Sequence, residues 1–139
     1  MIDATRLAPN LWIGSKPPPG DVLAKHGFHT VVLCAREWQP EGLYRGVEVI
    51  PAGFHDDPDG LDTEDLETAL WSSGVVAHRI LSGRRCLVTC WQGRNRSGLV
   101  CALALTRAAR IPPNVAGEIV RAQRPFSLTN PAFRRMLGM

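Results

Sequence analysis

The sequence predicts an α/β fold with a central, largely parallel sheet of four to five strands flanked by helices. Short apolar runs that are rich in Val and Ile and bounded by Gly or Pro are typical of strands. Helical patterns separate these runs along the chain, as a parallel sheet requires. With 139 residues, of which 45% are hydrophobic and 21% charged, the chain is expected to form one domain over residues 1–139.

Each element can be placed from these patterns. Strands are expected at residues 11–13, 30–34, 47–50 and 86–90, and helices at 21–26, 63–81, 98–110, 114–123 and 131–137. The helix over 63–81 has the clearest start, because Asp62 is a good N-cap and the acids Glu64 and Asp65 complement the helix dipole. Gly74 lies inside this helix, so a kink or a break there is an alternative. The helix over 98–110 is apolar on nearly every side and is expected to be buried.

Composition favours a cytoplasmic monomer without a metal site. No run approaches the roughly 18 apolar residues of a membrane span, and the first residues lack a secretory pattern. The net charge of +3 suits acidic or phosphorylated partners but indicates no stable nucleic-acid or membrane partner. The four cysteines form no C-x-x-C pair, so neither a disulfide scaffold nor a zinc site is expected.

The segment from Cys90 to Gly98 carries the most specific chemical signal. A predicted strand runs through a tight loop directly into a buried helix, and Arg96 lies six positions after Cys90. Such a loop gathers backbone N–H groups around one point and aims the positive end of the helix dipole at it. The predicted phosphate-binding loop consists of Trp91, Gln92, Gly93, Arg94, Asn95 and Arg96.

The residue types in this segment suit nucleophilic chemistry on phosphorus. The helix dipole and Arg96 favour Cys90 as a thiolate nucleophile. The guanidinium of Arg96 can bind two phosphoryl oxygens in fork geometry. Gly93 allows the loop to turn where a side chain would crowd it. Ser97 is predicted to be the N-cap of the helix and to donate its hydroxyl to the Cys90 sulfur, which makes the sulfur a better leaving group.

A second pair with the same spacing, Cys101 and Arg107, shows that the spacing alone is a weak signal. This pair lies wholly inside the apolar helix and has no glycine between its members. It cannot form a loop, so core packing is the expected role of Cys101.

The leaving oxygen also needs an acid, and a carboxylate in a loop over the pocket can supply it. Residues 54–60 follow the strand predicted at 47–50 and contain three aspartates. Asp57 is the predicted acid, with Asp56 as the alternate. The other interpretation is that these acids cap turns, for which Asp-Pro-Asp-Gly is well suited.

At these residues the chain resembles the dual-specificity phosphatase branch of the protein tyrosine phosphatase superfamily, whose signature is HC-x5-R-[ST]. The likeness extends over almost the whole chain. Residues 7–15 are similar to the first strand of the family, residues 23–32 to the helix and strand that follow, and residues 120–125 and 130–133 to its closing helices.

This resemblance implies a phosphocysteine mechanism without a metal or cofactor. It implies that Cys90 is the nucleophile, Arg96 the phosphate ligand, Ser97 the hydroxyl that assists release of the thiolate, and Asp57 the acid and later the base. One departure is Thr89, which stands where the family usually has histidine. Cys34 is similar in position to a cysteine that pairs reversibly with the nucleophile in some lipid-directed members. A buried structural thiol is the alternative for Cys34.

The resemblance implies hydrolysis of phosphate monoesters, with phosphotyrosine and phosphoserine or phosphothreonine in proteins as the expected substrates. Arg94 stands where phosphoinositide-directed relatives carry lysine. Asn95, which precedes Arg96, is similar to the residue that RNA 5′-phosphatases have at this position. Phosphoinositides and RNA 5′ ends are therefore alternative substrates. Trp38 and Trp71 are candidates for a substrate surface, although a lone Trp on a helical face is more often core. Rhodanese-like sulfur transfer and a non-catalytic phospho-binding pseudophosphatase are further alternatives.

Overall fold

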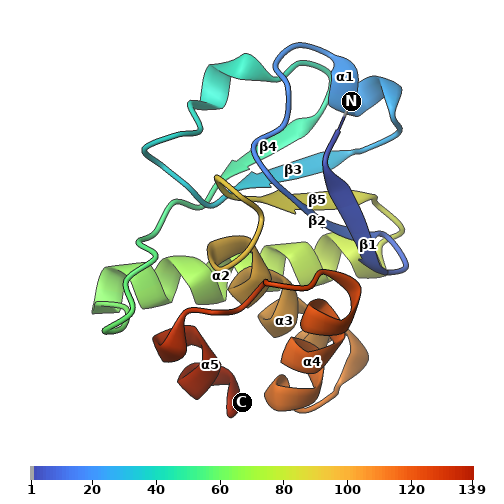
Figure 1. The fold of residues 1–139 in the computed structure, drawn as a ribbon. Helices are drawn as coiled ribbons and strands as arrows, with labels where there is room; N and C mark the ends of the chain where they lie inside the picture. Colours follow the sequence, from blue (N-terminus) through green and yellow to red (C-terminus); the bar gives the residue numbers. More distant parts are fainter. Residues whose placement is uncertain (1) are drawn as a thin grey trace.

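The computed structural model describes residues 2–139; Met1, the first residue of the predicted domain, lies outside the described residues. Five strands form one sheet in the order β1-β2-β5-β3-β4 (Figure 1). They are β1 (Ala4–Ala8), β2 (Leu11–Gly14), β3 (Thr30–Leu33), β4 (Glu48–Pro51) and β5 (Cys86–Thr89). β1 is antiparallel to β2, and every other neighbouring pair is parallel. The predicted fold class is therefore confirmed.

The sequence did not predict β1 as a separate strand. Of its five residues only Leu7 is buried, so it lacks the continuous apolar pattern of the three central strands. Its place at the edge of the sheet explains this, because an edge strand has a neighbour on only one side.

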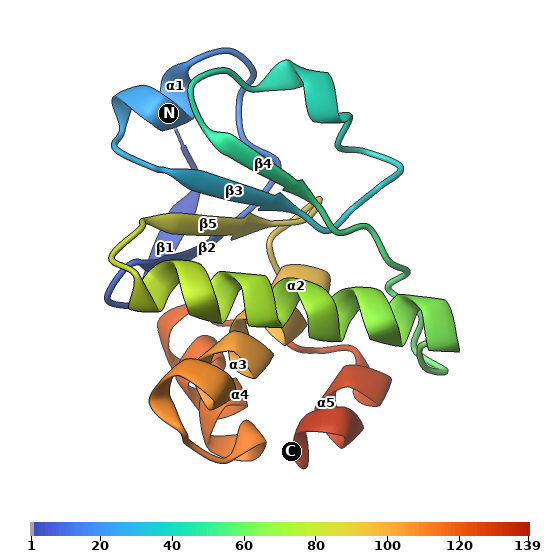
Figure 2. The same ribbon diagram turned by 180° about the vertical axis from the view of Figure 1, so that it is seen from behind.

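Helices cover both faces of the sheet. They are α1 (Val22–Lys25), the short 3₁₀ helix η1 (Glu41–Leu43), α2 (Thr63–Leu81), α3 (Arg96–Ala109), α4 (Pro113–Gln123) and α5 (Pro131–Leu137). α1 and η1 lie on one side of the sheet, and α2 to α5 lie on the other (Figures 1 and 2). Among residues 2–139, no helix has the length and apolar character needed to cross a membrane.

The predicted limits of α2 agree with the structure. Asp62 is its N-cap, and the Asp62 carboxylate accepts a hydrogen bond of 2.8 Å from the Asp65 N–H. The helix continues through Gly74 without a break. Gly74 lies against the end of the flexible Arg107 side chain of α3, whose guanidinium occupies the space into which a Cβ would project.

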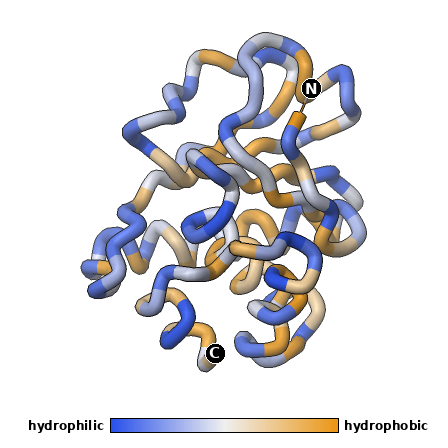
Figure 3. Tube along the Cα trace, in the orientation of Figure 1, coloured by the Kyte–Doolittle hydropathy of each residue, from blue (hydrophilic) through white to orange (hydrophobic). Residues whose placement is uncertain are grey.

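The two faces of the sheet have separate apolar cores. In β5, Leu87 packs with Leu23 and Phe28 on the side of α1, whereas Val88 packs with the side chains of α3 on the other side. This alternation is the period of two expected for a strand buried on both faces. The hydropathy trace shows apolar stretches along the strands through the middle of the molecule (Figure 3). Cys90, which follows β5, therefore lies at the carboxyl edge of a rigid central sheet.

Candidate active site

The loop from Cys90 to Arg96 connects β5 to α3, and the backbone carbonyls of residues 91–94 all accept hydrogen bonds from other segments. Trp91 O accepts from the Lys16 N–H (3.2 Å), Arg94 O accepts from the Leu128 N–H (3.2 Å), and Arg124 donates to Gln92 O (3.2 Å) and Gly93 O (2.7 Å). No hydrogen bond within residues 2–139 uses the N–H groups of residues 91–95. The loop therefore keeps its donors free, as an oxyanion site requires.

Gly93 adopts the conformation that the sequence predicted for a tight loop. Its φ is +66°, and a Cβ on this residue would collide with the backbone of Gly14. Any other residue would be strained there. Asp3 anchors Arg124 from behind the loop at 2.7 Å, which helps to hold this turn against the edge of the sheet.

Ser97 contacts the Cys90 sulfur but is not the N-cap of α3. Its Oγ lies 3.1 Å from Cys90 Sγ, and both side chains are buried. The helix begins at Arg96, with Asn95 in the N-cap position and no side-chain cap bond. The predicted capping role of Ser97 was wrong, because its hydroxyl is directed to the sulfur and the residue belongs to the first turn of the helix.

The guanidinium of Arg96 is buried and only partly satisfied by the protein. Its Nη1 donates to Glu37 Oε1 at 2.6 Å and to Phe54 O at 3.3 Å. Its Nε is buried without a partner among the described residues. Burial raises the pKa of Glu37, but the hydrogen bond and charge of Arg96 outweigh this, so the pKa lies below its ordinary value. Arg96 is thus oriented by a carboxylate and retains a free donor for an anion.

Asp56, rather than Asp57, lies beside the phosphate-binding loop. Its two carboxylate oxygens accept from Asn130 Nδ2 (2.7 Å) and Asn95 Nδ2 (3.1 Å). The Asp57 carboxylate accepts instead from the Asp59 N–H at 2.8 Å, inside the turn that ends at Gly60. Asp57 has the contacts of a turn residue, which was the other interpretation of this segment.

These side chains enclose a cavity of about 150 Å³. Its lining consists of Asp56, Cys90, Trp91, Gln92, Arg94, Asn95, Arg96 and Thr129. Every residue predicted for the phosphate-binding loop lies in this lining except Gly93, which is buried in the turn. Among residues 2–139, no group of three or more His, Cys, Asp or Glu side chains could hold a metal ion.

Two sequences of known proteins match the chain over most of its length, although no family model matches it. Human dual specificity phosphatase 28 is 33% identical over 131 residues, which cover 92% of this chain and 72% of the human protein. The mouse protein of the same name is 32% identical and is covered to 77%. The chain belongs to the dual-specificity phosphatase family. It is a cysteine-dependent phosphatase of this type.

Solved structures agree with this assignment. A variant of human DUSP28 has a TM-score of 0.81 at 30% identity, over 98% of this chain and 92% of that one. A mouse putative dual specificity phosphatase, crystallised with zinc tungstate, has a TM-score of 0.79 at 28% identity, over 99% and 86%. The resemblance that the sequence suggested is therefore confirmed.

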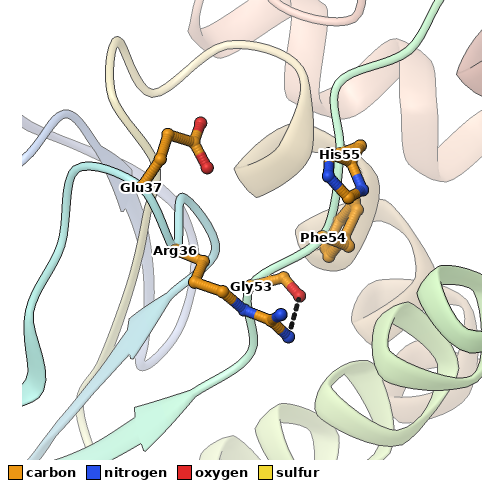
Figure 4. Close-up of a pocket in the computed structure, with 5 residues that line it drawn as sticks. All are labelled: Arg36, Glu37, Gly53, Phe54 and His55. Carbon is orange, nitrogen blue, oxygen red and sulfur yellow. Dashed lines mark hydrogen bonds between the residues drawn. The ribbon is translucent and has the colours of Figure 1, made fainter.

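A second hollow of this phosphatase is lined in part by Glu37, the residue that binds Arg96 of the Cys90 cavity. Arg36, Glu37, Gly53, Phe54 and His55 line it (Figure 4). Arg36 Nη2 donates to Gly53 O at 3.5 Å. His55 Nδ1 lies 2.7 Å from Asp65 Oδ2, and this hydrogen bond raises the pKa of His55 above its ordinary value. The hollow therefore carries both signs of charge beside the phosphate site.

Residues 37–39 contact the phosphate-binding loop and the end of β5 through three consecutive side chains. Glu37 binds Arg96, and the Trp38 ring packs on the Trp91 ring with centroids 4.9 Å apart. Gln39 Nε2 donates to Thr89 Oγ1 at 2.7 Å. We define this segment as the brace. Sequence reasoning did not assign these roles to Glu37 and Gln39.

Thr89, which stands where the family usually has histidine, is the buried partner of Gln39 in the brace. Its hydroxyl donates to Val32 O at 2.8 Å and accepts from Gln39, whose Oε1 accepts in turn from the Ala35 N–H at 2.9 Å. Thr89 is 0% exposed and Gln39 is 3% exposed. A satisfied chain of hydrogen bonds thus links the residue before the nucleophile to β3 and to the brace.

We expect Thr89→Val to lower the free energy of unfolding by about 1–3 kcal/mol, because it leaves the buried Gln39 amide without its acceptor. Denaturant unfolding followed by fluorescence measures this change. The control is Thr106→Val, because the Thr106 Oγ1 is buried with no partner among the described residues. That variant removes no hydrogen bond, so its change should stay within about 0.5 kcal/mol. Equal stability of the two variants would contradict the role given to Thr89.

Cys34 follows β3 just as Cys90 follows β5, and the two strands are parallel neighbours with Leu33 opposite Thr89. Cys34 is fully buried, and all four cysteines are free thiols. Burial and the neighbouring Cys90 raise the pKa of Cys34 well above its ordinary value. Its pairing with Cys90 stays a prediction.

Proposed function

We propose that this phosphatase hydrolyses phosphorylated tyrosine, serine and threonine side chains in proteins through a phosphocysteine intermediate on Cys90. The observation that carries the proposal is the loop of residues 91–95, whose N–H groups have no partner among residues 2–139 while the carbonyls of residues 91–94 accept hydrogen bonds from other segments. Free N–H donors around a cysteine, next to an arginine whose Nε has no partner in the same part of the chain, suit a tetrahedral oxyanion. The tungstate complex of the mouse relative gives further support, because tungstate is also a tetrahedral oxyanion.

The first half-reaction transfers the phosphoryl group to sulfur. The Cys90 thiolate attacks phosphorus, an S–P bond forms, and the P–O bond to the substrate breaks. The loop N–H groups and Arg96 stabilise the charge on the equatorial oxygens. The leaving oxygen receives a proton from Asp56, which we prefer to Asp57 because its carboxylate lines the cavity.

The second half-reaction releases phosphate. Asp56, now a carboxylate, takes a proton from a water molecule that attacks phosphorus as the S–P bond breaks. The Ser97 hydroxyl donates a hydrogen bond to the departing sulfur; Ser97 Oγ lies 3.1 Å from Cys90 Sγ. Every proton in this scheme moves between water, the substrate and side chains of the chain itself. The cytoplasmic location and the monomeric state stay predictions.

The experiment that tests the proposal traps the intermediate. Purified protein in EDTA is mixed with ³²P-labelled phosphotyrosine peptide, quenched in acid within the first turnover, and digested. The label should be on the peptide that contains Cys90. Turnover without label on that peptide would contradict the mechanism. Vanadate binding without any turnover would instead support a phospho-binding protein that is not an enzyme.

A further inference from the structure

Two tryptophans form an exposed aromatic surface at the mouth of the Cys90 cavity. Trp91 directly follows the nucleophile and lines the cavity, and Trp38 of the brace packs against it at an interplanar angle of 36°. Both are nearly half exposed, Trp91 at 44% and Trp38 at 49%. Tryptophan is enriched at binding interfaces, and an exposed apolar patch beside a cavity is a candidate for ligand contact.

The surface is held in place before any ligand arrives. The Trp91 carbonyl accepts from the Lys16 N–H, and the Lys16 ammonium lies 5.8 Å from the Trp91 ring centroid. Trp38 is fixed by its neighbours, since Glu37 binds Arg96 and Gln39 binds Thr89. Because the two rings are already ordered, less side-chain conformational entropy is lost when a ligand stacks on them.

We propose that the pair of Trp38 and Trp91 is a specificity determinant that favours aryl phosphates, so that phosphotyrosine is preferred to phosphoserine and phosphothreonine. The inference rests on the proposed function and concerns the group attached to the bound phosphate. In phosphotyrosine the ring is joined to phosphate by a single oxygen, so it lies directly beside the bound phosphate. Trp91 lines the phosphate cavity and is 44% exposed, so it is placed to contact such a ring.

A nucleic acid 5′ end is the competing occupant, because bases also stack on aromatic side chains. Two observations favour the phosphotyrosine ring. In a nucleotide the ribose separates the base from the phosphate, whereas Trp91 lines the phosphate cavity itself. A nucleic-acid groove also needs a run of cations along the backbone, but here Arg94 and Lys16 share the surroundings of the cavity with Asp56 and Glu37.

The test compares selectivity rather than absolute activity. One peptide sequence is prepared with either phosphotyrosine or phosphothreonine, and kcat/KM is measured for each. In Trp91→Leu and Trp38→Ala we expect the ratio of tyrosine to threonine activity to fall by about 2- to 10-fold, the range that an aromatic pair contributes. The fall should appear mainly in KM for the phosphotyrosine peptide. Trp91→Phe keeps a ring and should retain most of the ratio.

Trp71→Ala is the matched control. Trp71 is also exposed, at 54%, but it lies on α2 beside a different hollow. Its ratio should equal that of the wild type. An unchanged ratio in both Trp91→Leu and Trp38→Ala would overturn the inference. So would a 5′-phosphorylated oligoribonucleotide that is a better substrate than the phosphotyrosine peptide and loses more activity in these variants. A wild type that hydrolyses none of the substrates would overturn the proposed function itself.

Discussion

Replacing Cys90 with serine is expected to lower kcat by at least about 10⁴-fold, because the nucleophile of the proposed mechanism is lost. A serine hydroxyl is nearly the same size, so the side chain, which is 4% exposed, can be replaced without a large cavity. It is a far weaker nucleophile, however, and the free N–H groups of the loop cannot change that. Turnover of p-nitrophenyl phosphate in EDTA, with vanadate binding as a check on the loop, measures the effect.

Cys101→Ala is the control for this prediction, because Cys101 and Arg107 have the same spacing as Cys90 and Arg96. Cys101 is fully buried inside α3, and burial raises its pKa well above the ordinary value of a thiol. The variant should lose thermal stability, since it leaves a small cavity, but should keep kcat within a few-fold of the wild type. More than about 1% of wild-type turnover in Cys90→Ser would mean that another group attacks phosphorus.

The sequence was sufficient to predict those parts of the site whose residues lie close together in the chain. Cys90, Arg96 and Ser97 lie within eight consecutive residues, and a strand, a loop and a helix over that length leave little freedom for their relative positions. The contact between Ser97 and the sulfur followed from this spacing. The start of α3 did not, because a two-residue shift in a helix boundary lies below the resolution of capping rules.

Contacts between distant segments could not be derived in the same way. Glu37 reaches Arg96 across 59 residues, and Arg124 reaches Gly93 across 31. One signal was available for Glu37, because it follows β3 at the same edge of the sheet where Cys90 follows β5. No comparable signal pointed to Arg124, whose role depends on how α4 packs beside β1.

The choice between Asp56 and Asp57 also depends on a contact with a distant segment, which the sequence could not predict. Both follow β4 in a loop, and the sequence favoured Asp57, with Asp56 as the alternate. Asn130, which is 74 positions away, donates to the Asp56 side chain and to the Asp57 backbone carbonyl. Asn130 is also the N-cap of α5, where it accepts from the N–H groups of Ala132 and Phe133. The orientation of the acid loop is therefore set by a helix at the other end of the chain.

Asp56→Asn is expected to lower kcat/KM by about 10²- to 10⁴-fold for substrates with a poor leaving group, because these need a proton in the transition state of the first half-reaction. Phenyl phosphate and a phosphoserine peptide are such substrates. p-Nitrophenyl phosphate has a good leaving group that departs without full protonation, so its loss in kcat/KM should be about tenfold or less. The dependence of kcat/KM on the leaving group is therefore the diagnostic measurement, because the second half-reaction, in which Asp56 is the base, is the same for every substrate.

Asp57→Asn is the matched comparison, since both side chains are exposed and one position apart. An asparagine at this position can still accept from the Asp59 N–H through its amide oxygen, so the turn should persist and kcat/KM should stay within a few-fold for every leaving group. Asp56→Ala is included because an asparagine between two side-chain amides could reorient them. If Asp57→Asn shows the leaving-group dependence and both Asp56 variants do not, the loop must rearrange when substrate binds, and the acid that the sequence first favoured would be the correct one.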